Sequence, residues 1–435
     1  MTDAIVIGAG TDELAAAHQL LRAGRSVIVV QEHAAPAHTE GWVPRALAMP
    51  GVIVDQPDPW LRTLLPDGGA LELWQDMPRS AEAIRRVSPR DADAWPEFCE
   101  RMAKLAALLE ELYLSPPPSL VDLRFALKIR RLGRVGMEDL MRILPMPVAE
   151  LLDDWFENDA LKGALGALAV RDLQQGPRSA GTAFRLLHFH VGNPPGVFRP
   201  PRSNYVHLAR SGLDIREGTV RRISVRAGQA TGITLDSGEL SAALVISGAD
   251  PKRTLGELVE PGWLDPDLLR AVRNIRCRGV TAHIDLELER APEWKTLSLA
   301  PSLDYVERAY DDAKYRRLSA NPCVEAVADG ARVHARVQYV PPSAQGEISI
   351  KPFERYLPPI KRTTLQALSH AWPEGQPHHA ELSLDQALWM RPLPELSGYR
   401  SPIKGLWLCG PAMHPGAGVA GASGYNCAKA LLRDL

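Results

Sequence analysis

The chain has 435 residues, of which 45% are hydrophobic and 23% are charged, and its formal net charge is −2. This length exceeds what one hydrophobic core usually supports, so two closely packed domains are expected. The near-neutral charge gives no field that would attract nucleic acid, which makes a nucleic-acid-binding function a poor hypothesis.

The cysteines and the N-terminus indicate a reduced, cytoplasmic protein. The five cysteines are odd in number and no two form a Cys-x-x-Cys pair, so neither a disulfide redox centre nor a metal site is predicted. The first ten residues lack the basic start and the cleavage site of a secretory signal. No run of 18 apolar residues is present, so no membrane-spanning helix is expected.

Residues 4–30 predict a strand, a glycine-rich turn, a helix and a second strand. The apolar runs 4–7 and 27–30 suit buried parallel strands, and residues 14–21 have helical spacing. Gly8 permits a tight turn, and Gly10 allows backbone to approach a pyrophosphate, which lies on the helix N-terminus. This βαβ unit is typical of a dinucleotide-binding domain.

Residues 75–175 are predicted to be mostly helical, with a break at residues 115–118, which read Ser-Pro-Pro-Pro. The stretch 123–144 places basic residues among apolar ones: Arg124, Lys128, Arg130, Arg131 and Arg134. A solvated basic face is the simpler interpretation. The alternative is a basic amphipathic helix that makes peripheral contact with an anionic membrane surface.

The second half of the chain mixes strands and helices. Strands are predicted over 219–225, 230–235, 244–247, 280–288 and 333–340, and helices over 267–272 and 359–372. Residues 405–410 predict a strand that enters a glycine-rich turn, and a helix follows over 424–432. A cofactor domain assembled from separated segments, with substrate segments between them, is the arrangement expected from this order.

Several blocks resemble the phytoene-desaturase-like flavoproteins, a family of amine-oxidase and carotenoid-desaturase type. The blocks are 405–431, 246–254, Asp385-Gln386 with Met390-Arg391-Pro392, and Gly181-Thr182-Ala183 with Leu187-His188. The resemblance implies an α/β protein: a glutathione-reductase-like FAD/NAD(P)-binding Rossmann domain with an inserted α+β substrate domain. It further implies bound FAD and the dehydrogenation or oxidation of an isoprenoid-like or other lipophilic substrate by hydride transfer to flavin.

The resemblance also implies a division of the chain. The FAD-binding domain would comprise residues 1–74, 201–255 and 399–435, with a helical substrate segment at 75–200 and a substrate domain at 256–398. The implied cofactor-binding residues are Gly8, Ala9, Gly10, Thr11, Gln31, Glu32, Val220, Gly410, Gly416, Gly418 and Val419. Backbone N–H groups at such glycines can meet the phosphate and the polar edge of a flavin. A second explanation for the glycines is that they let a helix pack closely on a strand.

His414 and His188 are the candidate catalytic residues, with His190 nearby as a third acid–base candidate. A lone histidine is more often structural, so a structural role stays open for each. Asp385 and Arg391 are expected to anchor the last linker by hydrogen bonds.

The FAD-binding elements depart from the family pattern at four places. Glu13 replaces the third glycine of the fingerprint, beside Asp12. If an acid side chain faces the pyrophosphate, one pair of like charges about 5 Å apart weakens cofactor binding by roughly 3 kcal/mol at an effective dielectric constant near 20. Alternatively, both acids favour the helix dipole and point to solvent. Gln31 takes the place of the acid that binds ribose, and Glu32 is expected to face the opposite side. The other two departures replace glycine pairs, and they are Ala37-His38 and Ser203-Asn204.

Two hypotheses follow. The first is a flavin oxidoreductase, which the intact glycine-rich motif over residues 405–431 (the closing motif) favours. The second is a flavin-free descendant of the fold that acts as a non-redox enzyme or as a structural partner of an active paralogue. A lipophilic small molecule is the expected substrate partner. A separate nicotinamide site has no support, because only one nucleotide fingerprint is present.

Overall fold

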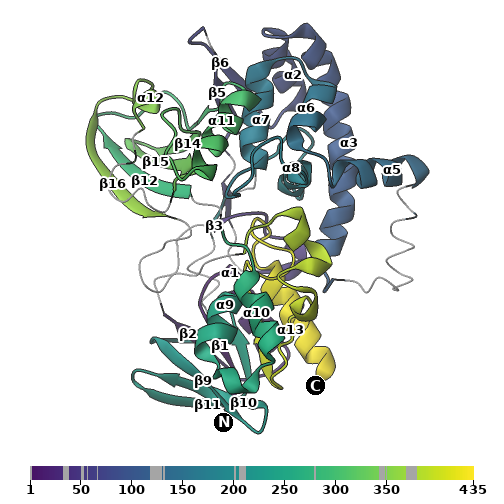
Figure 1. The fold of residues 1–435 in the computed structure, drawn as a ribbon, viewed down its shortest axis with the longest axis vertical. Helices are drawn as coiled ribbons and strands as arrows, with labels where there is room; N and C mark the ends of the chain where they lie inside the picture. The colour runs from purple at the N-terminus through teal and green to yellow at the C-terminus, as the bar shows by residue number, and fades with distance from the viewer. Residues whose placement is uncertain are drawn as a thin grey trace.

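The structure is a computed structural model that describes residues 2–32, 39–49, 53–55, 57–65, 67–117, 130, 133–199, 202–204, 212–278, 281–341, 348, 350–368 and 380–435. Figure 1 shows one sheet near the N-terminus at one end of the long axis. A second sheet and a layer of helices lie at the other end. This arrangement matches the predicted α/β class with an inserted α+β domain.

The first sheet is the Rossmann sheet that the N-terminal motif predicted. Its strands, in spatial order, are β8 (Asp214–Glu217), β2 (Val27–Gln31), β1 (Thr2–Ile7), β11 (Gly238–Ser247), β10 (Gln229–Leu235) and β9 (Val220–Arg226), with β17 (Leu406–Leu408) beside β11. The pairs β8–β2, β2–β1, β1–β11 and β11–β17 are parallel. The β1 core residues 4–7 are fully buried, as expected for a strand covered on both faces.

Four helices accompany this sheet. They are α1 (Thr11–Arg22), α9 (Pro251–Arg253), α10 (Pro266–Asn274) and α13 (Ala422–Asp434). Helices α1 and α13 touch at the backbone, because a Cβ on Gly424 would overlap the carbonyl oxygen of Asp12. The N-termini of α1 and α13 therefore lie side by side, although the two helices come from opposite ends of the sequence.

The second sheet belongs to the substrate side. Its order is β16 (Ile360–Leu368), β12 (Thr281–Leu288), β15 (Arg332–Gln338), β14 (Val324–Asp329), β13 (Thr296–Leu299), β5 (Leu61–Leu64) and β6 (Ala70–Leu73). Two expectations need correction. Within the helix predicted over 359–372, residues 360–368 form strand β16, since Ile360, Thr363 and Thr364 suit a strand and β16 pairs antiparallel with β12; residues 369–372 lie outside the described residues. The domain boundary predicted at residue 74 is late, because β5 and β6 already pair in the second sheet.

The helical layer is formed by α2 (Met77–Arg85), α3 (Pro89–Tyr113), α6 (Val148–Trp155), α7 (Asp159–Ala169), α8 (Thr182–His190) and α11 (Leu303–Lys314). Helix α3 begins where the Ser88 hydroxyl caps the N–H of Asp91. The buried Asp91 carboxylate accepts hydrogen bonds from the N–H groups of Glu157 and Asn158, which ties α3 to the start of α7. Helix α3 then runs toward the closing motif and ends at Tyr113.

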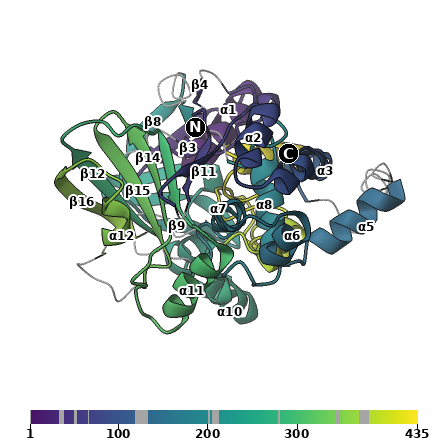
Figure 2. The ribbon, with the colours of Figure 1, turned by 90° about the horizontal axis from the view of Figure 1, so that it is seen from above.

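Smaller elements complete the fold: α12 (Lys351–Glu354) and the short sheet β3 (Thr39–Glu40), β7 (Arg202–Asn204) and β4 (Ile53–Asp55). Helix α5 (Gly133–Ile143) extends away from the body of the molecule (Figure 2). Within the described parts of the chain, no helix has both the length and the apolar character needed to cross a membrane.

Candidate dinucleotide site

The glycine-rich loops predicted to bind a cofactor meet at one end of the first sheet. The N–H of Gly248, just after β11, donates to the carbonyl of Ile7 at 2.9 Å. The N–H of Cys409, just after β17, donates to the carbonyl of Ser247 at 2.8 Å. The turn after β1, Gly248 and Gly410 therefore surround the N-terminus of α1. Ligands bind at this edge in open α/β sheets, at the carboxyl ends of the strands.

The side chain of Glu13 fills the space between these loops. A Cβ on Gly10 would lie 2.6 Å from its Oε2, and a Cβ on Gly8 would lie 3.0 Å from its Cγ. A Cβ on Gly248 would overlap the same carboxyl group. The carboxyl accepts hydrogen bonds from the backbone N–H groups of Gly10 and of Glu13 itself. These are the donors of the helix N-terminus, where a diphosphate binds in dinucleotide folds.

Asp12 occupies the neighbouring helix N-terminus in the same manner. Its carboxylate lies near the N–H groups of Gly424, Ser423 and Gly421 at the start of α13, which act to lower its pKa, while its Oδ1 has no hydrogen-bond partner among the described residues. Burial raises the pKa of Asp12 to about 6. Burial, with the charge of Asp12 as a second cause, raises the pKa of Glu13 to about 8, so Glu13 is mainly protonated at neutral pH. Both acids are buried, and neither points to solvent.

The space between the glycine-rich loops is called the dinucleotide slot. Glu32 lies at the other end of this slot, beside Val220. Its Oε1 accepts a hydrogen bond from the Val220 N–H at 2.8 Å. Arg253 donates to both carboxylate oxygens, at 2.5 and 2.7 Å. Strand β2 ends at Gln31, so the strand alternation behind the expectation that Glu32 faces the opposite side does not extend to Glu32. Gln31 is buried, and its carbonyl accepts a hydrogen bond from the Gly218 N–H.

The glycines of the closing turn lie against protein side chains. Gly416 has φ +103°, and a Cβ there would lie 2.9 Å from Leu382 and 3.0 Å from Arg391 Nε. Gly418 has φ +99°, and a Cβ there would lie 2.9 Å from His188 Nε2. Close packing thus already requires both glycines. Their contact with a cofactor, and that of the buried Val419, stay predictions.

The remaining predicted positions lie in separate segments. The buried Ala9 and Thr11 lie in the turn and the first helical position after β1. Ser203 and Asn204 lie in β7, of which the structure describes the backbone. Ala37-His38 lies outside the described residues.

The two candidate catalytic histidines hold the closing turn. His188 Nε2 donates to the carbonyl of Ala417 at 2.8 Å, so its Nδ1 accepts the Tyr113 hydroxyl at 2.9 Å. His414 Nε2 donates to the carbonyl of Leu112 at 3.2 Å. Burial lowers the pKa of His188 to about 3 and that of His414 to about 4. Both rings are neutral at pH 7. This geometry favours a positioning role, and the catalytic roles stay predictions.

His190 and Arg391 also serve the scaffold. His190 Nδ1 donates to the carbonyl of Val197, away from the closing turn. The buried Arg391 guanidinium donates to the carbonyls of Met413 and Pro411, among others, and so anchors the last linker as expected.

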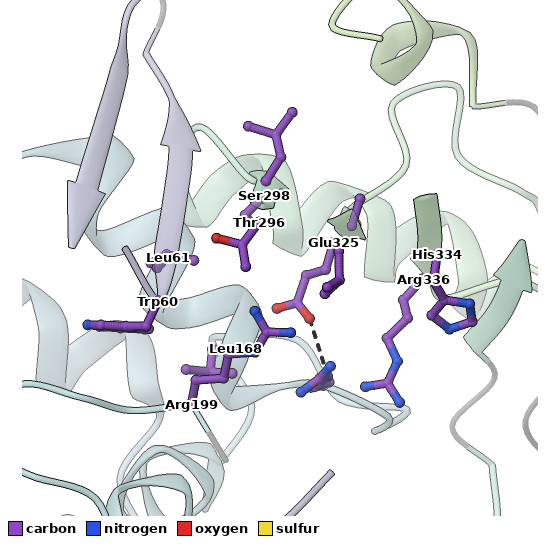
Figure 3. Close-up of a pocket in the computed structure, with 13 residues that line it drawn as sticks. Trp60, Leu61, Leu168, Arg199, Thr296, Ser298, Glu325, His334 and Arg336 are labelled. Atoms are coloured by element: carbon purple, nitrogen blue, oxygen red, sulfur yellow. Dashed lines mark ion pairs between the residues drawn. The ribbon is translucent and has the colours of Figure 1, made fainter. Parts of the chain in front are cut away.

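A second hollow lies on the substrate side, between the second sheet and α7 (Figure 3). Its volume is about 30 Å³, and its apolar walls are formed in part by Trp60, Leu61 and Leu168. Arg171 and Glu325 form an ion pair of 3.2 Å beside it. The sequence alone did not indicate this pair, because 154 positions separate its members and neither belongs to a recognisable motif.

The hydroxyl groups of Thr296 and Ser298 also face this hollow from β13. Both are buried, and neither finds a hydrogen-bond partner within the described residues. Buried hydroxyls usually have such a partner, so a water molecule or a small polar group of a ligand would satisfy them there.

The donors of the dinucleotide slot fit a diphosphate, because backbone N–H groups at a helix N-terminus are surrounded by glycines that leave the space open. Among the described residues, the Glu13 carboxyl is the group that takes the diphosphate's place. It ends a flexible side chain, so its rotation would clear the slot while the backbone stays where it is.

Comparisons with known proteins agree with this architecture. No protein-family profile matches the chain. Pyridine nucleotide-disulfide oxidoreductase domain-containing protein 2 of Rattus norvegicus is 26% identical to this chain. The aligned region spans 100% of this chain and 94% of that relative. One of the limonene dehydrogenase subunits of Castellaniella defragrans is 23% identical, with coverage of 100% and 95%.

Solved structures show the same fold. Putrescine oxidase has a TM-score of 0.60 at 14% identity, covering 100% of this chain and 99% of that chain. An oxidoreductase from Methanosarcina mazei has a TM-score of 0.58 at 13% identity, with coverage of 99% and 100%. The predicted resemblance is confirmed to this extent: along its whole length the chain is similar to proteins named as oxidoreductases, and its fold is that of putrescine oxidase.

Proposed function

We propose that the protein is an FAD-dependent oxidoreductase that dehydrogenates or oxidises a lipophilic substrate by hydride transfer to the flavin. The observation that carries the proposal is the meeting of Gly8–Gly10, Gly248 and Gly410 around the N-terminus of α1. This is the geometry that a Rossmann sheet uses for a dinucleotide. When FAD is bound, it supplies the hydride acceptor, and the protein supplies binding, orientation and shape.

The chain's own residues would divide these tasks. The N–H groups at the start of α1 would bind the diphosphate, and the Glu32–Arg253 pair would form the wall of the slot beside Val220. His188, Tyr113 and His414 would keep the closing turn against α3 and α8. Because both histidines are neutral at pH 7 and already bonded, they would act as fixed walls and exclude water.

A lipophilic substrate is supported by one relative. The name limonene dehydrogenase refers to a hydrocarbon, whereas putrescine oxidase refers to an amine.

The test is anaerobic bleaching of flavin absorbance after reconstitution of the full chain with FAD. A panel would contain limonene, longer isoprenoid alkenes, putrescine and an aliphatic monoamine. Bleaching by one of the alkenes supports the proposal. Bleaching by amines alone would overturn the proposed substrate class. A chain that takes up no FAD would overturn the proposal that FAD is the cofactor.

The position of Glu13 favours a second candidate function, a flavin-free descendant that acts with an active paralogue. The limonene dehydrogenase relative is itself one subunit of a larger enzyme by its name. This candidate requires a chain that binds no FAD but forms a stable complex with a paralogous protein. Size-exclusion chromatography of the chain co-expressed with such a paralogue separates it from the first proposal.

A cytoplasmic location with peripheral membrane contact also belongs to the proposal. Helix α5 exposes Val135, Met137 and Met141, and its Arg134 and Arg142 form ion pairs with Glu138 and Asp154. Exposed apolar side chains on one projecting helix suit the interface of a membrane.

A further inference from the structure

Glu13 stands in the fingerprint where a glycine is expected, and its side chain turns inward. The carboxyl is buried between Gly8, Gly10 and Gly248, and only 6% of the residue is exposed. Its oxygens accept the N–H groups of Gly10 and Glu13. A carboxyl group in this place makes the hydrogen bonds that a phosphate would otherwise make.

The same position leaves no room for both groups. A Cβ on Gly248 or on Gly10 would collide with the Glu13 carboxyl, so a phosphate of larger volume could not share the space. The neighbouring helix N-terminus is also covered, because the buried Asp12 carboxylate lies near the N–H groups at the start of α13. Binding of a diphosphate therefore requires the Glu13 side chain to leave.

We infer that Glu13 is an internal competitor for the diphosphate of FAD and sets the affinity of this chain for the cofactor. The inference rests on the proposed function, because it assumes that FAD binds at this loop. In the FAD-free protein the side chain occupies the slot. In the complex it is displaced, and the free energy of that displacement weakens binding.

The test is FAD affinity, measured by the change in flavin fluorescence when FAD is titrated into the purified full chain. Glu13→Gly removes the competitor and restores a residue without a side chain. Its dissociation constant should fall about tenfold or more below that of the wild type. Glu13→Gln keeps an amide of the same shape in the slot, so its affinity should stay within a few-fold of the wild type.

Glu150→Gly is the matched control. Glu150 is the third residue of α6, as Glu13 is of α1, and it is exposed. The control should leave the affinity for FAD unchanged. Thermal unfolding of each variant, with and without FAD, provides a second readout: FAD should raise the melting temperature of Glu13→Gly more than that of the wild type.

The outcomes distinguish the inference from the proposed function. Equal, tight binding by the wild type and Glu13→Gly would overturn the inference and leave the proposed function standing. Failure of FAD to bind to the wild type, Glu13→Gly and Glu13→Gln, all folded, would overturn both. Tighter binding by Glu13→Gly alone supports both.

Discussion

Glu32 and Arg253 form a two-pronged ion pair across 221 positions of the sequence. The pair joins the end of β2 to α9, and the Glu32 carboxylate also holds the N–H of Val220. It thereby fixes three segments around one end of the dinucleotide slot. The Glu32 side chain is 7% exposed and that of Arg253 is 23% exposed, so solvent screens the pair only in part.

Arg253→Ala should therefore destabilise the fold. Loss of the guanidinium leaves the Glu32 carboxylate largely buried with one N–H donor, which should lower the unfolding free energy by about 2 kcal/mol. Urea denaturation measures the change. Arg222→Ala is the matched control, because the Arg222–Glu260 pair is half exposed and should contribute less than about 1 kcal/mol. Equal effects of the two substitutions would contradict the role assigned to Arg253.

Glu13 should make stability fall as pH rises. Its folded pKa of about 8 lies above the ordinary value of 4.5, so between these values the folded state holds a proton that the unfolded state has released. The stabilising contribution is complete below about pH 4.5 and is lost as pH rises through 8, with a slope of up to about 1.4 kcal/mol per pH unit.

Glu13→Gln replaces the titrating carboxyl with an amide that does not titrate, and it serves as the comparison. Denaturant titrations at pH 5, 6, 7 and 8 measure the unfolding free energy of both proteins. As the pH rises, the variant should become increasingly more stable than the wild type. Asp12 remains in both proteins, so its own titration largely cancels. A pH-independent difference would show that Glu13 is not buried as described.

His188→Phe tests the positioning role of that histidine. The ring volume is nearly kept, but the Tyr113 hydroxyl and the Ala417 carbonyl lose their buried partner. The unfolding free energy should fall by about 2 kcal/mol. His334→Phe, whose side chain is 36% exposed, should cost less than about 1 kcal/mol and is the control. A stable His188→Phe protein that binds FAD normally but has lost turnover would instead favour a catalytic role.

Helix α5 provides the test of membrane contact. Val135→Glu combined with Met141→Glu places two negative charges on its exposed apolar side. Co-flotation with vesicles of phosphatidylserine and phosphatidylcholine should be lost, because anionic lipid repels the new charges. Tyr315→Glu, at an equally exposed residue outside α5, should leave flotation unchanged. Flotation that is indifferent to the double substitution would end the proposal.

The local parts of this structure follow from the sequence, and the long-range parts do not. The βαβ start and the strands over 219–247 were predictable because apolar periodicity and turn residues are local signals. Strand β16 was not, since its pairing with β12 lies about 80 positions away in the sequence. The inward turn of Glu13 also depends on distant residues: Gly248 and Gly410 leave the space into which it folds.

The candidate site shows the same division. The glycine motifs were predicted to contact the cofactor, and in the structure Gly8, Gly10 and Gly410 lie around Glu13 at the N-terminus of α1. Strand alternation predicted that Glu32 faces the side opposite to Gln31, but β2 ends at Gln31, so the alternation does not extend to Glu32. The Arg171–Glu325 pair joins a helix end to a strand edge, and no local pattern indicates such a contact.

The decisive experiment is the titration of FAD into the purified wild-type chain and into Glu13→Gly. We expect saturable binding of one FAD per chain to both proteins, with the tighter dissociation constant in the glycine variant. If neither folded protein binds FAD saturably, the chain is not a flavin oxidoreductase whose diphosphate site holds a competing carboxyl.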